Sequence, residues 1–205
     1  MITLHHLRIG RSIFTVWLLE ELGVDYKLKV YHRNPETMRA PAELKDAHPL
    51  GKSPVIDDDG LVLSESAAIT SYILEKFDQD NKFSPSPSSL NEWATYQQWL
   101  AYPEGSVFAP LLLKMLTLRS GVEHPVMTPF SEAEIKLHFE HITKQLGEND
   151  FILGGKFSGA DFAITYMVSM AERLGLISEY PTLAAYFERM KQRDAFKRAI
   201  EKAVE

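Results

Sequence analysis

The sequence predicts an α/β domain followed by an all-helical domain, and three observations support this prediction. Strand and helix patterns alternate within residues 1–78, whereas residues 90–205 show helical spacing only. Between them, residues 79–89 read QDNKFSPSPSS, a polar segment rich in proline and serine that has the composition of a linker. The chain of 205 residues is long enough to bury a sizeable core.

The first segments of the α/β part alternate between strand and helix patterns. Residues 2–7 are apolar and β-branched, as in a buried strand. Apolar residues at helical spacing follow over residues 12–22 and stop at Gly23, a common helix end. Residues 26–31 alternate lysine with apolar side chains, which is typical of a half-buried strand, and residues 41–47 have the pattern of a short helix.

A hairpin and a further helix complete the first part. Two short apolar runs, residues 54–56 and 61–63, flank the sequence Asp-Asp-Asp-Gly. An Asp-Gly pair between two such runs is a strong hairpin signal. Residues 64–77 then return to helical spacing. The order is therefore β-α-β-α-β-β-α, which is the order of the thioredoxin-like fold.

The second part contains helix signals throughout. A long apolar and aromatic pattern covers residues 90–118. Ser131 with Glu134 has the spacing of a capping box, and residues 158–161 repeat that spacing, so each pair predicts the start of a helix. Pro181 is expected to open another helix, because proline suits the first helical turn.

The composition excludes several classes of function. There are 22 lysines and arginines against 28 acidic residues, a net charge of −6 that argues against a nucleic-acid partner. The absence of cysteine excludes disulfides, cysteine-bound metal and a protein thiol nucleophile. No apolar run reaches the ~18 residues of a membrane span, and the first residues lack a signal-peptide pattern. We expect a soluble cytoplasmic protein with no membrane partner and no metal.

Ser53-Pro54 is the first pair with a candidate role in binding. A proline that opens a strand before a hairpin is, taken alone, an ordinary strand-edge residue. In the β-α-β-α-β-β-α order, however, the thioredoxin-like fold places a cis-proline at this point. A cis-proline here would present the backbone of Ser53 to an extended peptide.

Glu65-Ser66 is the second such pair, because it follows a predicted strand and opens a predicted helix. The N–H groups of a helix N-terminus, with the Ser66 hydroxyl, form a small anion site, and Glu65 can hold an ammonium group. Together they would grip the carboxylate and amine of an amino-acid end. The alternative is simple capping, since serine and glutamate are favoured in a first turn.

Gly10-Arg11-Ser12 lies between the first strand and the first helix. In thioredoxin-like folds the reactive group sits at this position, where the positive end of the helix dipole stabilises a thiolate. The alternative is a capping serine, Ser12, beside a solvated Arg11.

In this order and spacing, the segments resemble the cytosolic glutathione transferase superfamily over nearly the whole chain. The branch with WLLEELG and AEGS-like segments, found in bacteria and fungi, is the most similar. The resemblance rests on four segments of the sequence: Arg11-Ser12 with Val16–Gly23, His48–Val55, Leu63–Ile69 and Ser158–Asp161.

The resemblance implies that the first part binds glutathione as co-substrate. The Ser53 backbone, before cis-Pro54, would pair with the cysteinyl unit, Glu65 and Ser66 would hold the γ-glutamyl end, and Lys52 would approach the glycyl carboxylate. The resemblance also implies a homodimer and an apolar site for the second substrate. The candidates for that site are Phe14, Tyr102, Phe108, Leu111 and Met115.

One departure from the family pattern concerns the thiol. Related sequences usually read Ser-Arg-Ser where this chain reads Gly10-Arg11-Ser12, and the first serine is the one expected to hydrogen-bond the glutathione sulfur. Ser12, Arg11 or the backbone N–H groups at the helix start could take its place, so Arg11 and Ser12 are the candidate catalytic side chains. Lowering a thiol pKa by ~2 units requires about 2.7 kcal/mol. A charge-assisted hydrogen bond of about 1.5–3 kcal/mol, together with the helix dipole, is sufficient.

The resemblance implies an enzyme that conjugates glutathione to an electrophilic, apolar substrate, as in detoxification, with peroxide reduction as an extension of the same chemistry. The alternative is a non-catalytic binding or regulatory protein of the same fold, which Gly10 favours. A plain thioredoxin-like redox protein is disfavoured, because the chain has no Cys-x-x-Cys motif.

Overall fold

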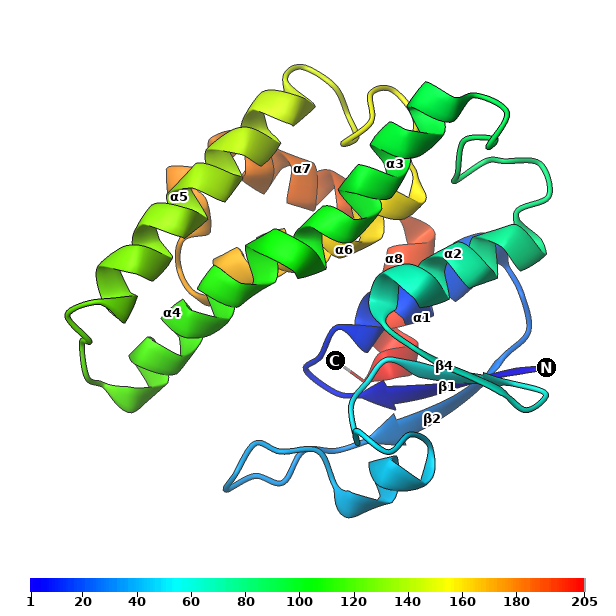
Figure 1. Cartoon of the computed structure of the whole chain (residues 1–205), viewed down its shortest axis with the longest axis horizontal. Coiled ribbons are helices and arrows are strands. Elements are labelled where there is room, and N and C mark those ends of the chain that lie inside the picture. The colour runs from blue at the N-terminus through cyan, green and yellow to red at the C-terminus, as the bar shows by residue number, and fades with distance from the viewer. Residues whose placement is uncertain (205) are drawn as a thin grey trace. The chain divides into compact units, whose positions relative to one another are not determined.

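A four-stranded mixed sheet is the centre of the first part of the computed structural model, which describes residues 1–204. The strand order is β2-β1-β3-β4, with β1 parallel to β2 and antiparallel to β3, and with β3 antiparallel to β4. The strands are β1 Ile2–Leu7, β2 Lys27–Tyr31, β3 Val55–Asp58 and β4 Leu61–Ser64 (Figure 1). The predicted hairpin between β3 and β4 is confirmed.

Helices cover the sheet as the sequence predicts. Helix α1 (Ser12–Leu22) ends at Gly23 with a φ of 64°, and α2 is Ser66–Phe77. Figure 1 shows α1 and α2 on one side of the sheet, and the short helix η1 (Ala42–Asp46) on the other. Leu44 of η1 is buried with Leu7 and Tyr31 of the sheet. The β-α-β-α-β-β-α order of the thioredoxin-like fold is confirmed.

The chain divides into two units, and the first of them is discontinuous. One unit contains Met1–Lys82 together with the chain from Lys191 on, and the other contains Phe83–Met190. Residues 79–89 include neither helix nor strand. The division at 78 and 89 stays a prediction, but the structure differs from it for the last helix, which lies with the α/β unit.

That last helix, α8 (Asp194–Ala203), is held on α1 by charge pairs. The Glu21 carboxylate accepts hydrogen bonds from Nε and Nη2 of Arg193, at 2.5 and 2.9 Å. Glu20, only 6% exposed, binds Arg198 and Lys202 at 3.0 and 2.6 Å. The carboxylates of α1 therefore have their cationic partners in a segment ~170–180 residues later.

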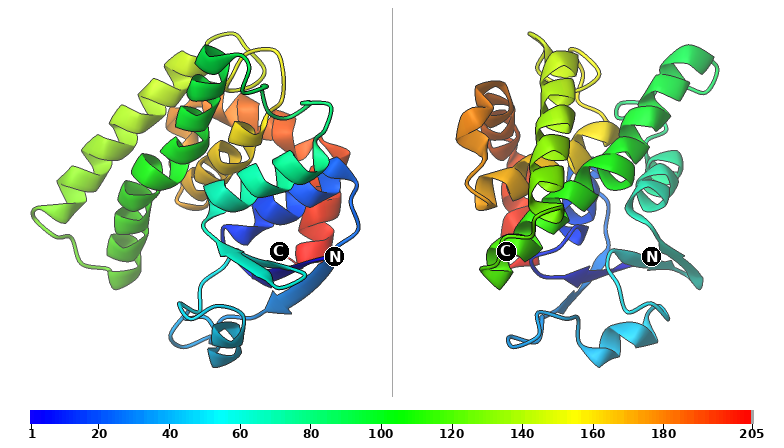
Figure 2. Two further views of the ribbon diagram at one scale, coloured as in Figure 1. Left: turned by 45° about the vertical axis from the view of Figure 1, so that its right-hand side comes forward. Right: turned by 60° about the vertical axis from the view of Figure 1, so that its left-hand side comes forward.

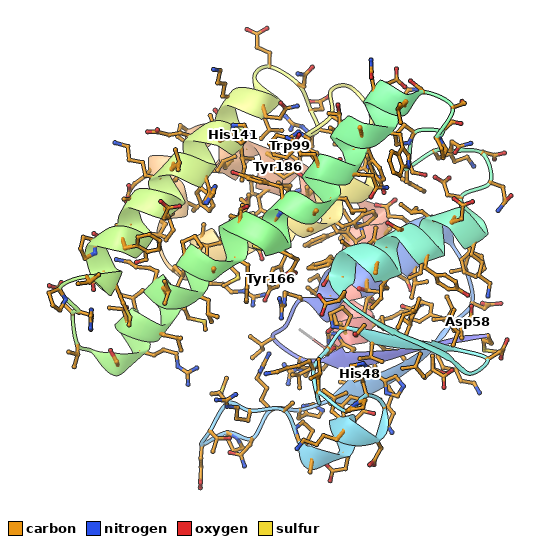
Figure 3. All side chains as sticks on the ribbon, viewed as in Figure 1. His48, Asp58, Trp99, His141, Tyr166 and Tyr186 are labelled. Carbon is orange, nitrogen blue, oxygen red and sulfur yellow. The ribbon has the colours of Figure 1, made fainter. Side chains whose placement is uncertain are left out.

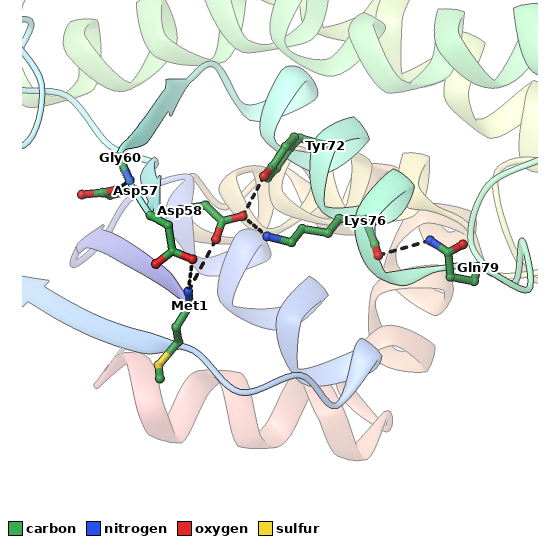
Figure 4. Close-up of polar contacts among 8 residues, drawn as sticks. Met1, Asp57, Asp58, Gly60, Tyr72, Lys76 and Gln79 are labelled. Carbon is green, nitrogen blue, oxygen red and sulfur yellow. Dashed lines mark hydrogen bonds and ion pairs between the residues drawn. The ribbon is translucent and has the colours of Figure 1, made fainter.

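A second buried carboxylate, Asp58, ties the hairpin to α2. Asp58 accepts a hydrogen bond from Tyr72 at 2.7 Å and pairs with Lys76, while the amino group of Met1 lies 3.7 Å from its other oxygen (Figure 4). The bond to Lys76 and then the bond to Tyr72 lower the pKa of Asp58 below its ordinary value. Asp58 therefore stays ionised in the folded chain at a pH where it is protonated in the unfolded chain.

We expect Asp58 to make stability sensitive to acid. Because its folded pKa is below the unfolded value of about 3.9, its contribution is fully present above that value and is lost as the pH falls through the folded pKa. The Asp58→Asn variant should unfold at lower urea than the parent at pH 7, and this difference should shrink at pH 3. An equal difference at both pH values would contradict the assignment.

The second unit is built of helices, as the sequence predicts. Figure 2 shows α4 and α5 as a hairpin that turns at one end. The elements are α3 Leu90–Tyr102, a π-helical turn η2 Pro103–Val107, α4 Phe108–Ser120, α5 Met127–Leu146, α6 Gly159–Arg173, a 3-10 turn η3 Ile177–Glu179, and α7 Pro181–Lys191. Among residues 1–204, no helix is long and apolar enough to cross a membrane.

One of the two predicted capping boxes is present. Asp161 at the start of α6 accepts hydrogen bonds from the N–H and hydroxyl of Ser158, and Pro181 opens α7 as predicted. The box at Ser131 is wrong, because α5 begins at Met127 and the Ser131 hydroxyl donates to Thr128 O within the helix.

Candidate functional site

A four-residue loop joins β1 to α1 and carries the first candidate residues. The strand ends at Leu7 and the helix begins at Ser12, so the loop is residues 8–11. Ile9 has a φ of 54°, a left-handed conformation that is unfavourable for a β-branched side chain. Backbone strain of this kind is concentrated at functional sites, where the surrounding structure maintains it.

Ser12 is completely buried, at 0% exposure, and its hydroxyl is engaged inside the fold. Its oxygen accepts the N–H of Leu7 at 3.2 Å, is hydrogen-bonded to Nδ1 of His6 at 2.9 Å, and donates to Leu7 O at 3.4 Å. A serine has one hydroxyl proton, and here that proton has partners within the fold. The position therefore suits a residue that holds the loop, and it leaves Arg11 as the candidate donor to a ligand.

Ser53 lies just before β3, the strand that pairs antiparallel with β1, and the peptide bond between Ser53 and Pro54 is cis. The Ser53 hydroxyl donates to His5 O at 2.7 Å and accepts the N–H of Leu7 at 3.1 Å. The N–H of Leu7 is thus shared between the hydroxyls of Ser12 and Ser53, which links the start of α1 to the cis-proline turn. The hydroxyl of Ser53 is used in the fold, so its backbone is the part available to a ligand.

Glu65 and Ser66 lie where β4 leads into α2. Glu65 is exposed, has a φ of 72°, and makes no capping hydrogen bond with its side chain. Ser66 is buried and is the first residue of α2. The capping alternative is therefore not supported for Glu65. A strained backbone with an exposed carboxylate is the arrangement expected of a residue kept for a ligand.

Lys52 and Pro54 flank Ser53 and differ in their surroundings. The side chain of Lys52 is exposed, whereas Pro54 is buried. Of the five predicted glutathione-binding residues, Lys52, Ser53 and Pro54 directly precede β3, Glu65 directly follows β4, and Ser66 opens α2.

The structure adds Arg33, a residue that the sequence analysis missed. Its guanidinium donates to the carbonyl oxygens of Arg8 and Ile9, at 3.1 and 2.9 Å, and so contacts the loop before α1. A side chain at position 10 would start 3.3 Å from Nη2 of Arg33. No sequence pattern indicates Arg33. It follows β2, and the carbonyl that it contacts, Ile9 O, lies 24 residues earlier in the chain.

The candidates for the second-substrate site are divided between the two units. Phe14 is buried in α1 of the first unit. In the second unit, Phe108, Leu111 and Met115 recur at helical spacing along α4 and so share one side of it. Their grouping with Phe14 into one site stays a prediction.

Tyr102, at the end of α3, is the polar member of that set. Its hydroxyl lies 2.7 Å from Nδ1 of His138, and burial raises the pKa of Tyr102. His141 stacks on Trp99 with ring centroids 5.3 Å apart (Figure 3). The Tyr102 hydroxyl is therefore held by α5, in an aromatic cluster of the second unit.

Comparison with known proteins gives a consistent result over both parts of the chain. Residues 1–75 match the family described as glutathione S-transferase, N-terminal domain, and residues 121–203 match its C-terminal domain. Glutathione S-transferase 3 of Schizosaccharomyces pombe is 31% identical, over 98% of this chain and 88% of the relative.

Solved structures agree with this comparison. A glutathione S-transferase of Actinobacillus pleuropneumoniae superposes with a TM-score of 0.90 and 36% identity, over 100% of this chain and 93% of that one. A glutathione transferase homolog of Lodderomyces elongisporus, solved with two GSH per subunit, has a TM-score of 0.83 at 20% identity, over 98% of both chains.

Proposed function

Since the chain belongs to the glutathione transferase superfamily, we propose that it joins the sulfur of glutathione to a small, apolar electrophile through the residues described above. The observation that supports this most directly is Glu65, whose strained backbone and exposed carboxylate serve no capping role. That arrangement is costly to the fold, by about 1–3 kcal/mol, and a ligand that pairs with the carboxylate accounts for it.

The proposed grip uses both ends of the tripeptide. Glu65 binds the amino group of the γ-glutamyl unit, and Ser66 with the first N–H groups of α2 binds its carboxylate. The backbone of Ser53, before cis-Pro54, pairs with the cysteinyl unit as a neighbouring strand would. Lys52, with its exposed side chain, approaches the glycyl carboxylate.

These contacts place the thiol of glutathione at the start of α1. There the helix dipole favours the thiolate, and Arg11 is the proposed donor to it. Ser12 acts through the loop by holding Leu7 and His6. In the reaction, the thiolate sulfur forms a bond to the electrophilic carbon, and the electron pair of the broken bond leaves with the departing group or enters the electrophile's own π-system.

Two further parts of the proposal concern the substrate and the assembly. Phe14, Tyr102, Phe108, Leu111 and Met115 would contact the electrophile. Peroxide reduction, which consumes two glutathione molecules, stays a prediction, as do the homodimer, the cytoplasmic location and the role in detoxification. The non-catalytic alternative would keep the grip on glutathione but give no turnover.

We expect the Glu65→Ala variant to bind glutathione about tenfold more weakly than the parent, because a lost charge-assisted hydrogen bond is worth about 1.5–3 kcal/mol and part of it is screened at an exposed site. The measurement is calorimetric titration with glutathione. Glu75→Ala is the matched control, because Glu75 is also an exposed carboxylate and lies in α2, the helix that Glu65 precedes. Equal affinity of both variants and the parent would remove Glu65 from the grip.

A further inference from the structure

The guanidinium of Arg33 is fixed against the loop that precedes α1. It donates Nε–H to Arg8 O at 3.1 Å, Nη2–H to Ile9 O at 2.9 Å and Nη1–H to Met38 O at 3.1 Å. Three bonds from one planar group to three carbonyls leave it little freedom to rotate. The side chain is therefore part of the loop's support, and its positive charge has a defined place.

That place is the side-chain space of residue 10. A Cβ atom built on Gly10 would lie 3.3 Å from Nη2 of Arg33 and 2.7 Å from the carbonyl oxygen of Leu7. The first distance is a tight contact, and the second is shorter than real Cβ atoms show. Where other residues would extend a side chain from position 10, this chain has the edge of a guanidinium.

We propose that Arg33 supplies a permanent positive charge that stabilises the thiolate of bound glutathione, beside the donor Arg11 and at the position where Gly10 offers no hydroxyl. The inference rests on the proposed function, which puts that thiol at the start of α1. A guanidinium is charged at every relevant pH, so it acts as a permanent cation beside the loop.

A charge at this position is sufficient for the chemistry. An opposite charge within about 4–6 Å lowers the pKa of an acid by about 1–3 units. A thiol with an ordinary pKa of about 8.5 is only a few per cent ionised at pH 7, and a shift of about 2 units makes it mostly thiolate. Arg33 thus performs by charge what a serine hydroxyl performs by one hydrogen bond.

Two other cations belong to the same loop, and the experiment must separate them from Arg33. Arg8 and Arg11 lie on either side of Ile9-Gly10. Arg33 differs from both in coming from another segment of the chain, with its Nη2 3.3 Å from a Cβ built on Gly10. The experiment must also separate the effect of the Arg33 charge on the thiol from the effect of its three hydrogen bonds on the loop.

The test is the pH titration of thiolate absorbance in bound glutathione, for the parent and for the Arg33→Gln, Arg33→Lys and Arg11→Gln variants. We expect Arg33→Gln to raise the pKa of the bound thiol by 1 unit or more (about tenfold less thiolate at neutral pH). Arg33→Lys, which keeps the charge but not the planar fork, should stay within about half a unit of the parent.

S-methylglutathione has no thiol proton, so its affinity measures binding of the tripeptide without ionisation of the thiol. All four proteins should bind it alike. Loss of that binding in Arg33→Gln would make Arg33 a grip residue and overturn the inference, as would equal thiol shifts in Arg33→Gln and Arg33→Lys, or a shift in Arg11→Gln alone. If the parent itself fails to bind S-methylglutathione, the proposed function is wrong as well.

Discussion

Replacing Asp161 by alanine should lower the free energy of unfolding by about 3–5 kcal/mol, because four donors would lose their buried acceptor and each loss costs about 1 kcal/mol or more. The carboxylate is 0% exposed. It accepts hydrogen bonds from the N–H of Ile152 at 2.9 Å, the N–H and hydroxyl of Ser158 at 2.8 and 3.0 Å, and the hydroxyl of Tyr186 at 2.9 Å. These bonds join the start of α6 to α7 and to the segment before α6.

The titration of Asp161 adds a direction that can be checked. Burial raises its pKa to about 6, although the hydrogen bonds from Ile152, Ser158 and Tyr186 act to lower it. Because the folded pKa is above the unfolded value of about 3.9, the folded state binds the proton more tightly, and this group stabilises the fold increasingly as the pH falls from 6 toward 4. Asp161→Ala should remove that dependence.

Urea unfolding of the parent, Asp161→Ala and Tyr186→Phe measures the network. Tyr186→Phe removes only one donor and keeps the ring, so we expect a loss of about 1 kcal/mol. If Asp161→Ala unfolds within 1 kcal/mol of the parent, the carboxylate does not hold the unit together.

Local patterns were sufficient to predict the elements that local forces determine. The Asp-Gly turn and the capping box of α6 are each specified within a few residues, whereas the cis-proline before β3 was predictable only from the order of the elements around it. The prediction of a helix start at Ser131 was wrong, and local hydrogen bonds also explain this error. The N–H groups of Val126 and Met127 donate to Nδ1 of His124 at 3.2 Å, so an earlier residue caps α5 and the helix starts before the apparent box.

Long-range pairs explain what the sequence could not predict. Glutamate side chains in a helix are usually exposed, yet those of Glu20 and Glu21 are largely buried and pair with cations of α8. Their partners lie at the opposite end of the chain, and no periodicity links the two segments. Arg33 also has partners distant in the sequence. It donates to backbone carbonyls, which every residue has, so the sequence does not indicate the contact.

Ser12 shows how a correct resemblance still leaves a role open. The Arg-Ser pair at the start of α1 indicated two candidates for the thiol, and the sequence did not distinguish between them. In the structure, the Ser12 hydroxyl points into the protein interior, where it is hydrogen-bonded to His6 and Leu7. The choice depends on which way a side chain points, and spacing alone does not contain that information at the first residue of a helix.

Replacing Gly10 by serine should damage the protein, although serine is the residue that the resemblance to the family implies at this position. The new Cβ would lie 2.7 Å from the carbonyl oxygen of Leu7, a backbone atom that accepts a hydrogen bond from the Ser12 hydroxyl. Relieving an overlap of this kind costs about 1–3 kcal/mol. We therefore expect a lower midpoint of thermal unfolding and slower turnover of glutathione with a standard electrophile.

The control is Gly155→Ser, since in residues 1–204 no atom beyond its two chain neighbours lies within 4 Å of a Cβ built there, and the residue is exposed. That variant should unfold and turn over as the parent does. Gly10→Ser that is faster than the parent would show that the loop accepts a hydroxyl after all. The sharper measurement combines Gly10→Ser with Arg33→Gln: if the serine acts by displacing the guanidinium, the two losses in turnover will not add, because the second change removes a charge that the first has already moved.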